Sequence, residues 1–177
     1  MTLPVLLGHG ASGTAASMRP HVEGLRRRHV EASAVDLPRG NAERAVPVFA
    51  AMLGERPEAV VIGGHSYGGR VASMLAARQL VTGLVLLSYP LHRPGHPESL
   101  RTEHWAHIGC PVLLLSGESD PFARIELLRR SVGVLASAEL ITYPGVGHGL
   151  LAVLDDALDQ VARFVNHLAS SSRRRQK

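Results

Sequence analysis

The sequence contains a single cysteine, which excludes two common ways of stabilising a small protein. Cys110 has no second cysteine in the chain with which to form a disulfide bond, and one thiol cannot build a cysteine-rich metal site. Cys110 stands directly before Pro111, at the expected start of a buried strand. We therefore interpret it as a small buried hydrophobic residue.

Long hydrophobic runs are also missing. No apolar stretch approaches the roughly 20 residues that a membrane helix needs, and no segment has the charged start, apolar centre and small-residue cleavage site of a secretion signal. We expect a cytoplasmic protein without a membrane partner. Because 45% of the 177 residues are apolar, the chain can bury one sizeable core, and we expect one domain spanning residues 1–169.

Excess charge is confined to the end of the chain. The formal net charge is +4, and Arg173, Arg174, Arg175 and Lys177 carry the same number of positive charges, so the remainder balances. A serine run precedes them, and such polar tracts bury little apolar surface. We predict a basic, disordered tail at residues 170–177 and no nucleic-acid partner. A nucleic-acid or acidic partner for this tail is the alternative.

The motifs of P-loop nucleotide sites and of zinc proteases are absent. No G-x-x-x-x-G-K-[ST] occurs, so we expect no nucleotide cofactor. No H-E-x-x-H occurs either. His92 with His96, and His104 with His107, have ligand-like separations and form a metal-binding alternative. We interpret them as cleft or surface histidines and expect no metal.

Strand-like and helix-like runs alternate from end to end. This alternation is typical of a parallel sheet with helices on both faces. The predicted class is α/β, with six mostly parallel strands and about five helices. The expected strands are Leu3–Gly8, Val30–Asp36, Ala59–Gly63, Val81–Ser88, Pro111–Ser116 and Ala138–Tyr143.

Two helices carry specific signals. Asn41 is expected to cap one of them, although Pro47 means that this helix starts late or kinks. The last helix has the clearest apolar stripe. Its members are Leu151, Leu154, Leu158, Val161, Val165 and Leu168.

The most informative stretch is Gly64-His65-Ser66-Tyr67-Gly68. It follows an apolar run and opens a segment with helical spacing, as the sharp strand-to-helix turn of a nucleophile elbow requires. Glycines flank the serine where a Cβ would collide with the backbone, so the Ser66 hydroxyl is expected to stand exposed at the strand end.

An acid and a histidine follow this serine in the chain. Asp120 comes directly after an expected strand, and His148 lies in a glycine-flanked turn. The order Ser, Asp, His is that of an α/β-hydrolase. We predict that Ser66 is the nucleophile, His148 the base and Asp120 the acid that orients it, with Asp36 and Glu118 as reserve acids.

Acyl transfer also needs two donors for the developing oxyanion. The first strand runs directly into a glycine-rich loop that lets the backbone approach a substrate. We assign the donors to the backbone N–H groups of Tyr67, the residue after the nucleophile, and Ala11 in that loop.

The connection from Tyr89 to Cys110 has no strong pattern and is too short for a cap domain. Loops at the carboxyl ends of parallel strands carry ligand contacts, so we expect this segment to form one wall of the substrate cleft. Tyr89 and Trp105 are candidates for lining an apolar acyl pocket.

The segments Gly63–Ser73 and Gly83–His92 resemble a distinct branch of the α/β-hydrolase superfamily, and the likeness continues through Leu100–His104 and Gly117–Phe122. This branch is related to dienelactone hydrolases and includes bacterial predicted hydrolases and a subunit of an animal histone-acetyltransferase complex. The resemblance implies the hydrolase architecture, whereas the substrates of the branch are mostly unassigned. The chain has Ser66 where dienelactone hydrolases use cysteine, which argues against their lactone chemistry.

The sequence thus predicts a cofactor-independent serine hydrolase with a minimal fold, acting on a small or soluble ester or thioester through an acyl-enzyme. Two alternatives remain open. One is a catalytically idle hydrolase-fold binding module, as the animal complex subunit suggests. The other is transfer of the acyl group to an alcohol or amine by the same triad.

Overall fold

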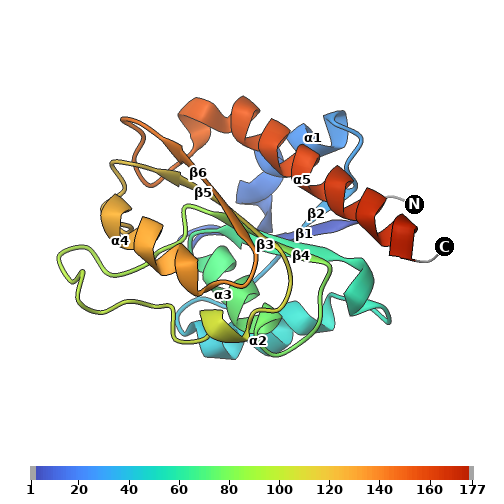
Figure 1. Ribbon diagram of the computed structural model, residues 1–177, viewed down its shortest axis with the longest axis horizontal. Coiled ribbons are helices and arrows are strands. Elements are labelled where there is room, and N and C mark those ends of the chain that lie inside the picture. Colours follow the sequence, from blue (N-terminus) through green and yellow to red (C-terminus); the bar gives the residue numbers. More distant parts are fainter. Residues whose placement is uncertain (1–2, 176–177) are drawn as a thin grey trace.

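A computed structural model describes residues 3–175 of the chain. Six parallel strands form one sheet in the order β2-β1-β3-β4-β5-β6 (Figure 1). The strands are β1 (Val5–Gly8), β2 (Ala32–Val35), β3 (Val61–His65), β4 (Gly83–Leu87), β5 (Val112–Gly117) and β6 (Ala138–Tyr143). The predicted α/β class and parallel sheet are confirmed.

Helices cover both faces of this sheet. They are α1 (Arg19–Arg27), α2 (Ala42–Ala51), α3 (Tyr67–Ala76), α4 (Ile125–Ser131) and α5 (Leu154–Arg175). In Figure 1, α1 and α5 lie together on one side of the sheet, and α2 and α3 lie on the other. The chain therefore folds as three layers with the sheet in the middle.

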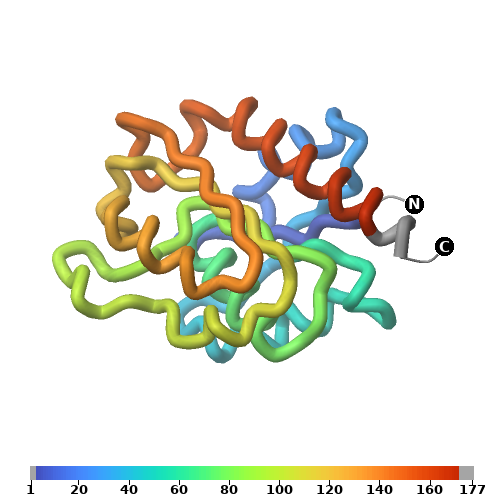
Figure 2. Tube along the Cα trace, viewed as in Figure 1, coloured from blue at the N-terminus to red at the C-terminus, as the bar shows by residue number. Residues whose placement is uncertain are grey.

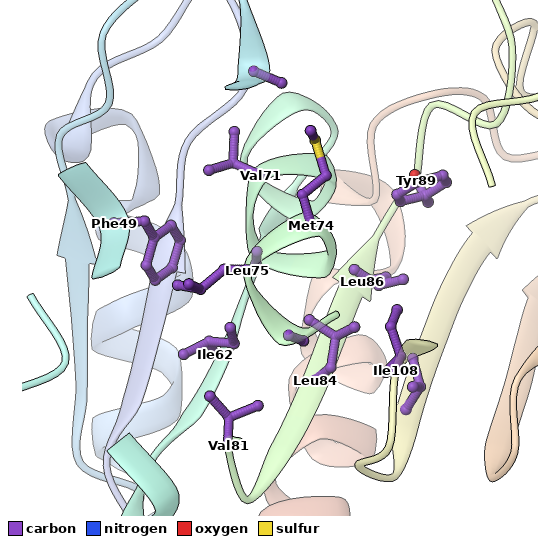
Figure 3. Packing of buried hydrophobic residues seen from close by; sticks show 14 of the residues in the cluster. Phe49, Ile62, Val71, Met74, Leu75, Val81, Leu84, Leu86, Tyr89 and Ile108 are labelled. Atoms are coloured by element: carbon purple, nitrogen blue, oxygen red, sulfur yellow. The ribbon is translucent and has the colours of Figure 1, made fainter. Parts of the chain in front are cut away.

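Each face of the sheet has its own buried cluster because a strand alternates its side chains between faces. On the α2–α3 side, Phe49, Ile62 and Leu75 pack together (Figure 3). On the α1–α5 side, Val61 faces residues such as Leu158 and Val161. Burial on both faces explains why the inner strands are almost continuously apolar in sequence.

The carboxyl ends of the central strands lie side by side. Gly8 of β1 pairs with Gly64 of β3, and His65 at the end of β3 pairs with Leu87 of β4. Ligands bind at this edge in open parallel sheets, near the point where the strand order reverses. In this sheet the order reverses between β1 and β3.

The turn from β3 into α3 packs closely against β1. A Cβ atom on Gly68 would overlap the backbone of Gly8, and one on Gly64 would overlap the Gly8 carbonyl. Ser66 between them has φ 49° and ψ −112°, in a region that side chains rarely occupy. The predicted need for glycine beside this serine is confirmed.

Helix α2 begins as the sequence predicts. The Asn41 side chain accepts a 2.8 Å hydrogen bond from the Glu43 N–H, so Asn41 is the cap. The helix starts directly after it and contains Pro47 in its interior, so the predicted late start is wrong. The proline lacks only the N–H that would donate to the Glu43 carbonyl.

Helix α5 extends past the expected end of the domain at residue 169 and runs through Arg175. Residues 176–177 of the predicted tail lie outside the described residues. The predicted apolar stripe of this helix is wrong at Leu151. That residue lies in a short 3₁₀ turn before α5, and it is 70% exposed.

The connection from Tyr89 to Cys110 forms the long yellow-green loop at the left of Figure 2. Its only described helical turn is a 3₁₀ segment, Trp105–His107, and no additional cap is evident over the sheet within residues 3–175. Cys110 at its end is buried, as expected, and burial raises the pKa of its thiol to about 11. Of the described helices, none is long and apolar enough to cross a membrane.

Candidate active site

Three side chains from distant parts of the sequence form a hydrogen-bonded chain at the carboxyl edge of the sheet. Ser66 Oγ lies 2.8 Å from His148 Nε2. His148 Nδ1 lies 2.8 Å from Oδ2 and 3.0 Å from Oδ1 of Asp120. The structure thus brings the three predicted catalytic residues together.

The Asp120 carboxylate determines which ring nitrogen of His148 carries the proton. A carboxylate only accepts hydrogen bonds, so Nδ1 must donate. Nε2 of the neutral ring is then the acceptor, directed at the Ser66 hydroxyl, which donates to it. This tautomer is the one in which a histidine can take a proton from serine.

Burial and local contacts hold both partners of the hydrogen bond between Asp120 and His148. The Asp120 side chain is fully buried, whereas that of His148 is 23% exposed. Asp120 Oδ1 also accepts a 2.8 Å hydrogen bond from the Phe122 N–H. The Phe122 ring packs on the His148 ring, with centroids 4.3 Å apart. The acid is held in one orientation, and the imidazole keeps a path to the cleft.

A cleft opens over these residues. It has a volume of about 650 Å³ and is lined by Ser66, Tyr67 and His148, together with the loop after β1 and the start of the connection after β4. Pro90 and Arg101 bring that connection to the cleft, which agrees with the wall expected from the sequence. The candidate nucleophile is therefore open to a small molecule.

A family model described as an alpha/beta hydrolase domain matches residues 3–166. The chain belongs to the alpha/beta hydrolase family. The match covers all six strands and most of α5.

Solved structures agree with this assignment of the fold. Monoacylglycerol lipase from Paleococcus ferrophilus superposes with a TM-score of 0.81 at 17% identity, covering 93% of this chain and 94% of that one. Dienelactone hydrolase from Anabaena variabilis superposes with a TM-score of 0.74 at 19% identity, covering 94% and 86%. At such low identity, these likenesses concern architecture alone.

One curated relative shares a shorter stretch. Non-heme chloroperoxidase from Burkholderia pyrrocinia is 38% identical over 63 residues, which is 35% of this chain and 23% of that protein. A lipase thus occurs among the structures with a similar fold, and a peroxidase shares a local stretch of sequence.

The two reserve acids have other partners in this hydrolase fold. Asp36, at the end of β2, accepts a 2.6 Å hydrogen bond from the Ala15 N–H. Glu118 accepts from Arg129 at 2.9 Å and from Thr142 at 2.7 Å. Neither contacts His148, so Asp120 is the acid that the geometry selects.

His65 supports the loop that carries His148. Its Nε2 donates to the His148 carbonyl at 3.2 Å, and the two rings lie 5.4 Å apart. Burial lowers the pKa of His65, so its ring is neutral near pH 7 and has one N–H to donate. His65 therefore acts as a positioning residue for the turn.

The predicted oxyanion donors, Ala11 and Tyr67, line the same cleft as Ser66. Tyr67 is the first residue of α3, and the first N–H groups of a helix have no partner within it. In the other loop, the Gly10 carbonyl accepts from the Gly13 N–H at 3.0 Å and from the His9 ring at 2.7 Å. A trans peptide directs the Ala11 N–H opposite to that carbonyl.

The expected aromatic lining of the acyl pocket is wrong. Tyr89 and Trp105 are 1% and 0% exposed, their rings lie 5.0 Å apart, and neither lines the cleft. The Tyr89 hydroxyl donates to the Arg101 carbonyl at 2.6 Å. Both rings are therefore part of the core beneath the cleft wall.

The histidine pairs of the metal alternative have other hydrogen-bond partners. His92 Nε2 accepts from the Arg124 N–H, and its Nδ1 donates to the Arg93 carbonyl. His104 shares a 2.7 Å hydrogen bond with Ser73. Within residues 3–175, no three histidine, cysteine or acidic side chains gather as a metal site would require.

Several cleft residues were not anticipated from the sequence. They are His21, Arg70, Arg101 and Phe122. Arg70 had a detectable signal, because it follows Ser66 by one helical turn on the same face. The other three reach the cleft through tertiary packing, and no local spacing marks them.

Proposed function

We propose that this protein is a serine hydrolase that cleaves a carboxylic ester or thioester through a covalent acyl-enzyme. The chain of hydrogen bonds from Ser66 through His148 to the buried Asp120 carries this proposal, because it supplies nucleophile, base and orienting acid in the required order.

The proposed reaction has two steps. Ser66 Oγ attacks the acyl carbonyl while its proton moves to His148 Nε2, and the oxyanion is bound by the N–H groups of Ala11 and Tyr67. The imidazolium then protonates the leaving alcohol or thiol. In the second step His148 takes a proton from water as the water oxygen attacks the acyl-enzyme, and the imidazolium returns that proton to Ser66 Oγ, which releases the carboxylic acid and the free serine.

The test is hydrolysis of p-nitrophenyl esters from acetyl to octanoyl. We expect turnover by the wild type and a loss of at least about 10³-fold in kcat for Ser66→Ala. His148→Ala is expected to lose a similar factor because the two residues act as one unit. Absence of turnover with every chain length would contradict the proposal.

The same assay separates the two alternatives predicted from the sequence. An acyltransferase would form the acyl-enzyme and release product faster when an alcohol or amine acceptor is added. A binding module, as expected for a relative of the histone-acetyltransferase complex subunit, would neither turn over esters nor acylate Ser66. We propose the hydrolase because all three side chains are in hydrogen-bonding positions.

A further inference from the structure

Two arginines line the same cleft as Ser66 and His148. Arg70 comes from α3, and Arg101 comes from the connection between β4 and β5. The proposed hydrolysis uses neither of them.

Arg70 lies one helical turn beyond the nucleophile. Its N–H donates to the Ser66 carbonyl at 3.0 Å, which places the two residues on one face of the helix. Long helical side chains lean toward the amino end of the helix, here the end at which Ser66 stands. The Arg70 Nε atom is buried and has no hydrogen-bond partner among the described residues.

Arg101 is held in place by its backbone. Its N–H donates to the Leu91 carbonyl at 2.8 Å, and its carbonyl accepts the Tyr89 hydroxyl at 2.6 Å. Tyr89 in turn packs on Trp105. The loop at this point is thus anchored to the core, and Arg101 lines the cleft from a fixed backbone.

No carboxylate neutralises these two charges. Of the ion pairs among the side chains of residues 3–171, none includes Arg70 or Arg101. Burial and repulsion by Arg70 and Arg93 lower the pKa of Arg101, and Glu103, the acid that acts on it, opposes this only in part. Partly buried cations without a partner are costly unless an anion joins them.

Guanidinium groups match the geometry of oxyanions. Each presents several N–H donors in a planar fork, which binds a carboxylate or phosphate through two parallel hydrogen bonds. Two such groups beside one nucleophile would hold an anionic part of a substrate while its acyl carbon faces Ser66.

We propose that Arg70 and Arg101 form an anion-binding subsite, and that the substrate is an ester or thioester carrying a carboxylate or phosphate group. This inference rests on the proposed hydrolase function and specifies its substrate class. Neutral esters would react at the same serine without the benefit of this subsite.

The experiment compares p-nitrophenyl hydrogen glutarate, which carries a free carboxylate, with neutral p-nitrophenyl hexanoate of similar length. The wild type is expected to show a kcat/KM at least about tenfold higher for the anionic ester, because charge-assisted hydrogen bonds are the strongest that a site can offer. In Arg101→Gln and Arg70→Met this ratio is expected to fall about tenfold or more.

Arg93→Gln is the matched control. Arg93 is exposed on the same connection and does not line the cleft, so its loss removes an equal charge without removing a guanidinium from the cleft. An equal fall of the ratio in Arg93→Gln would mean that long-range attraction, and not binding, sets the preference. That result would overturn the proposal.

Stability provides a second readout. Because neither guanidinium has an acidic partner, Arg70→Met and Arg101→Gln are expected to melt at or above the wild-type temperature. If Arg70→Met does not fold, Arg101→Gln alone decides the question. A preference ratio that is unchanged in a folded Arg101→Gln contradicts the subsite.

Competition identifies the anion. Free glutarate or inorganic phosphate is added to the wild type, and the one that reduces the preference for the anionic ester is the group that the subsite takes. Failure of both to compete contradicts the subsite. If the wild type hydrolyses p-nitrophenyl hexanoate as efficiently as p-nitrophenyl hydrogen glutarate, only this inference fails. If it hydrolyses neither ester, the hydrolase function itself is refuted.

Discussion

The Asp120 carboxylate fixes the tautomer of His148. Replacing it with an amide should therefore reduce ester hydrolysis. In Asp120→Asn the amide can donate to Nδ1, which stabilises the tautomer whose Nε2 carries the proton. That nitrogen could no longer accept a proton from Ser66. We expect kcat for ester hydrolysis to fall by about 10³ to 10⁴. Steady-state kinetics with a p-nitrophenyl ester measure this.

Glu118→Gln is the control for that variant. Glu118 stands two residues before Asp120 and was a reserve acid, but its contacts are Arg129 and Thr142. We expect Glu118→Gln to keep kcat within about twofold of the wild type, as for a surface change away from the chemistry. A similar loss in both variants would contradict the assignment of Asp120.

His21 gives a prediction about stability and pH. Burial and the neighbouring His65 lower the pKa of His21 to about 4, against about 6.5 in the unfolded chain. Between these values the unfolded state binds more protons, so the free energy of unfolding decreases as the pH falls from about 6.5 to about 4. His21 accounts for about 3 kcal/mol of this loss.

The variant His21→Gln removes this titration. Urea unfolding at pH 7 and at pH 4.5 should therefore show a smaller acid-induced loss than in the wild type. Part of the loss should persist, because burial also lowers the pKa of His104 to about 4. A loss equal to that of the wild type would show that His21 is not the group responsible.

The sequence was enough to predict the three hydrogen-bonded side chains of the candidate active site, because the chemistry of such a site restricts residue types. The elbow needs glycines around Ser66, and Asp120 and His148 follow at strand ends in the family order. Arg101 and His21 were not predicted as cleft residues. Tertiary packing brings them to the cleft, and no local sequence spacing marks such positions. The prediction that Tyr89 and Trp105 line the acyl pocket was wrong for a related reason. Both large rings are almost fully buried in the core, where they remove more apolar surface from water than a cleft wall would allow.

At the scale of elements, the contact between α3 and β1 sets the position of the elbow. A Cβ on Gly68 would overlap the Gly8 backbone, which cannot move without displacing the strand. Gly68→Ala is expected to lower the free energy of unfolding by about 3 kcal/mol, although alanine favours helices. Urea denaturation measures the change.

Gly133→Ala is the matched substitution at an unhindered glycine. Nothing lies within 4 Å of a Cβ at Gly133. We expect this variant to be as stable as the wild type, or up to about 1 kcal/mol more stable. If both variants lose equal stability, the close approach of α3 to β1 is not the cause.

The strands were predictable and the boundaries less so. Buried parallel strands are continuous apolar runs, so the runs near Val5, Val85 and Leu114 identified their strands. The observed strands β1 and β4 are shorter than the predicted ones, and β5 is shifted by one residue. The sequence did not define where α5 ends, because serine and arginine residues tolerate helix as well as coil. Hydrogen bonding to the neighbouring turns decides such boundaries, and composition does not record it.

At the scale of the whole molecule, the cleft lies directly over the carboxyl ends of the central strands. Leu151, which lines the cleft, is 70% exposed. The connection between β4 and β5 lines one side of the cleft and does not cover it. Substrates should therefore enter from water without a lipid surface to open the site. We expect hydrolysis of tributyrin to rise smoothly through its solubility limit. An abrupt increase above that limit would contradict an open cleft.

The most direct test of an activated Ser66 is intact-mass spectrometry after incubation with a fluorophosphonate. Phosphonylation needs the nucleophile and its base, but no knowledge of the natural substrate. We predict one phosphonyl adduct on the wild type, none on Ser66→Ala and greatly slowed labelling of His148→Ala. A folded wild type that remains unmodified would contradict a serine hydrolase and direct the search toward binding partners.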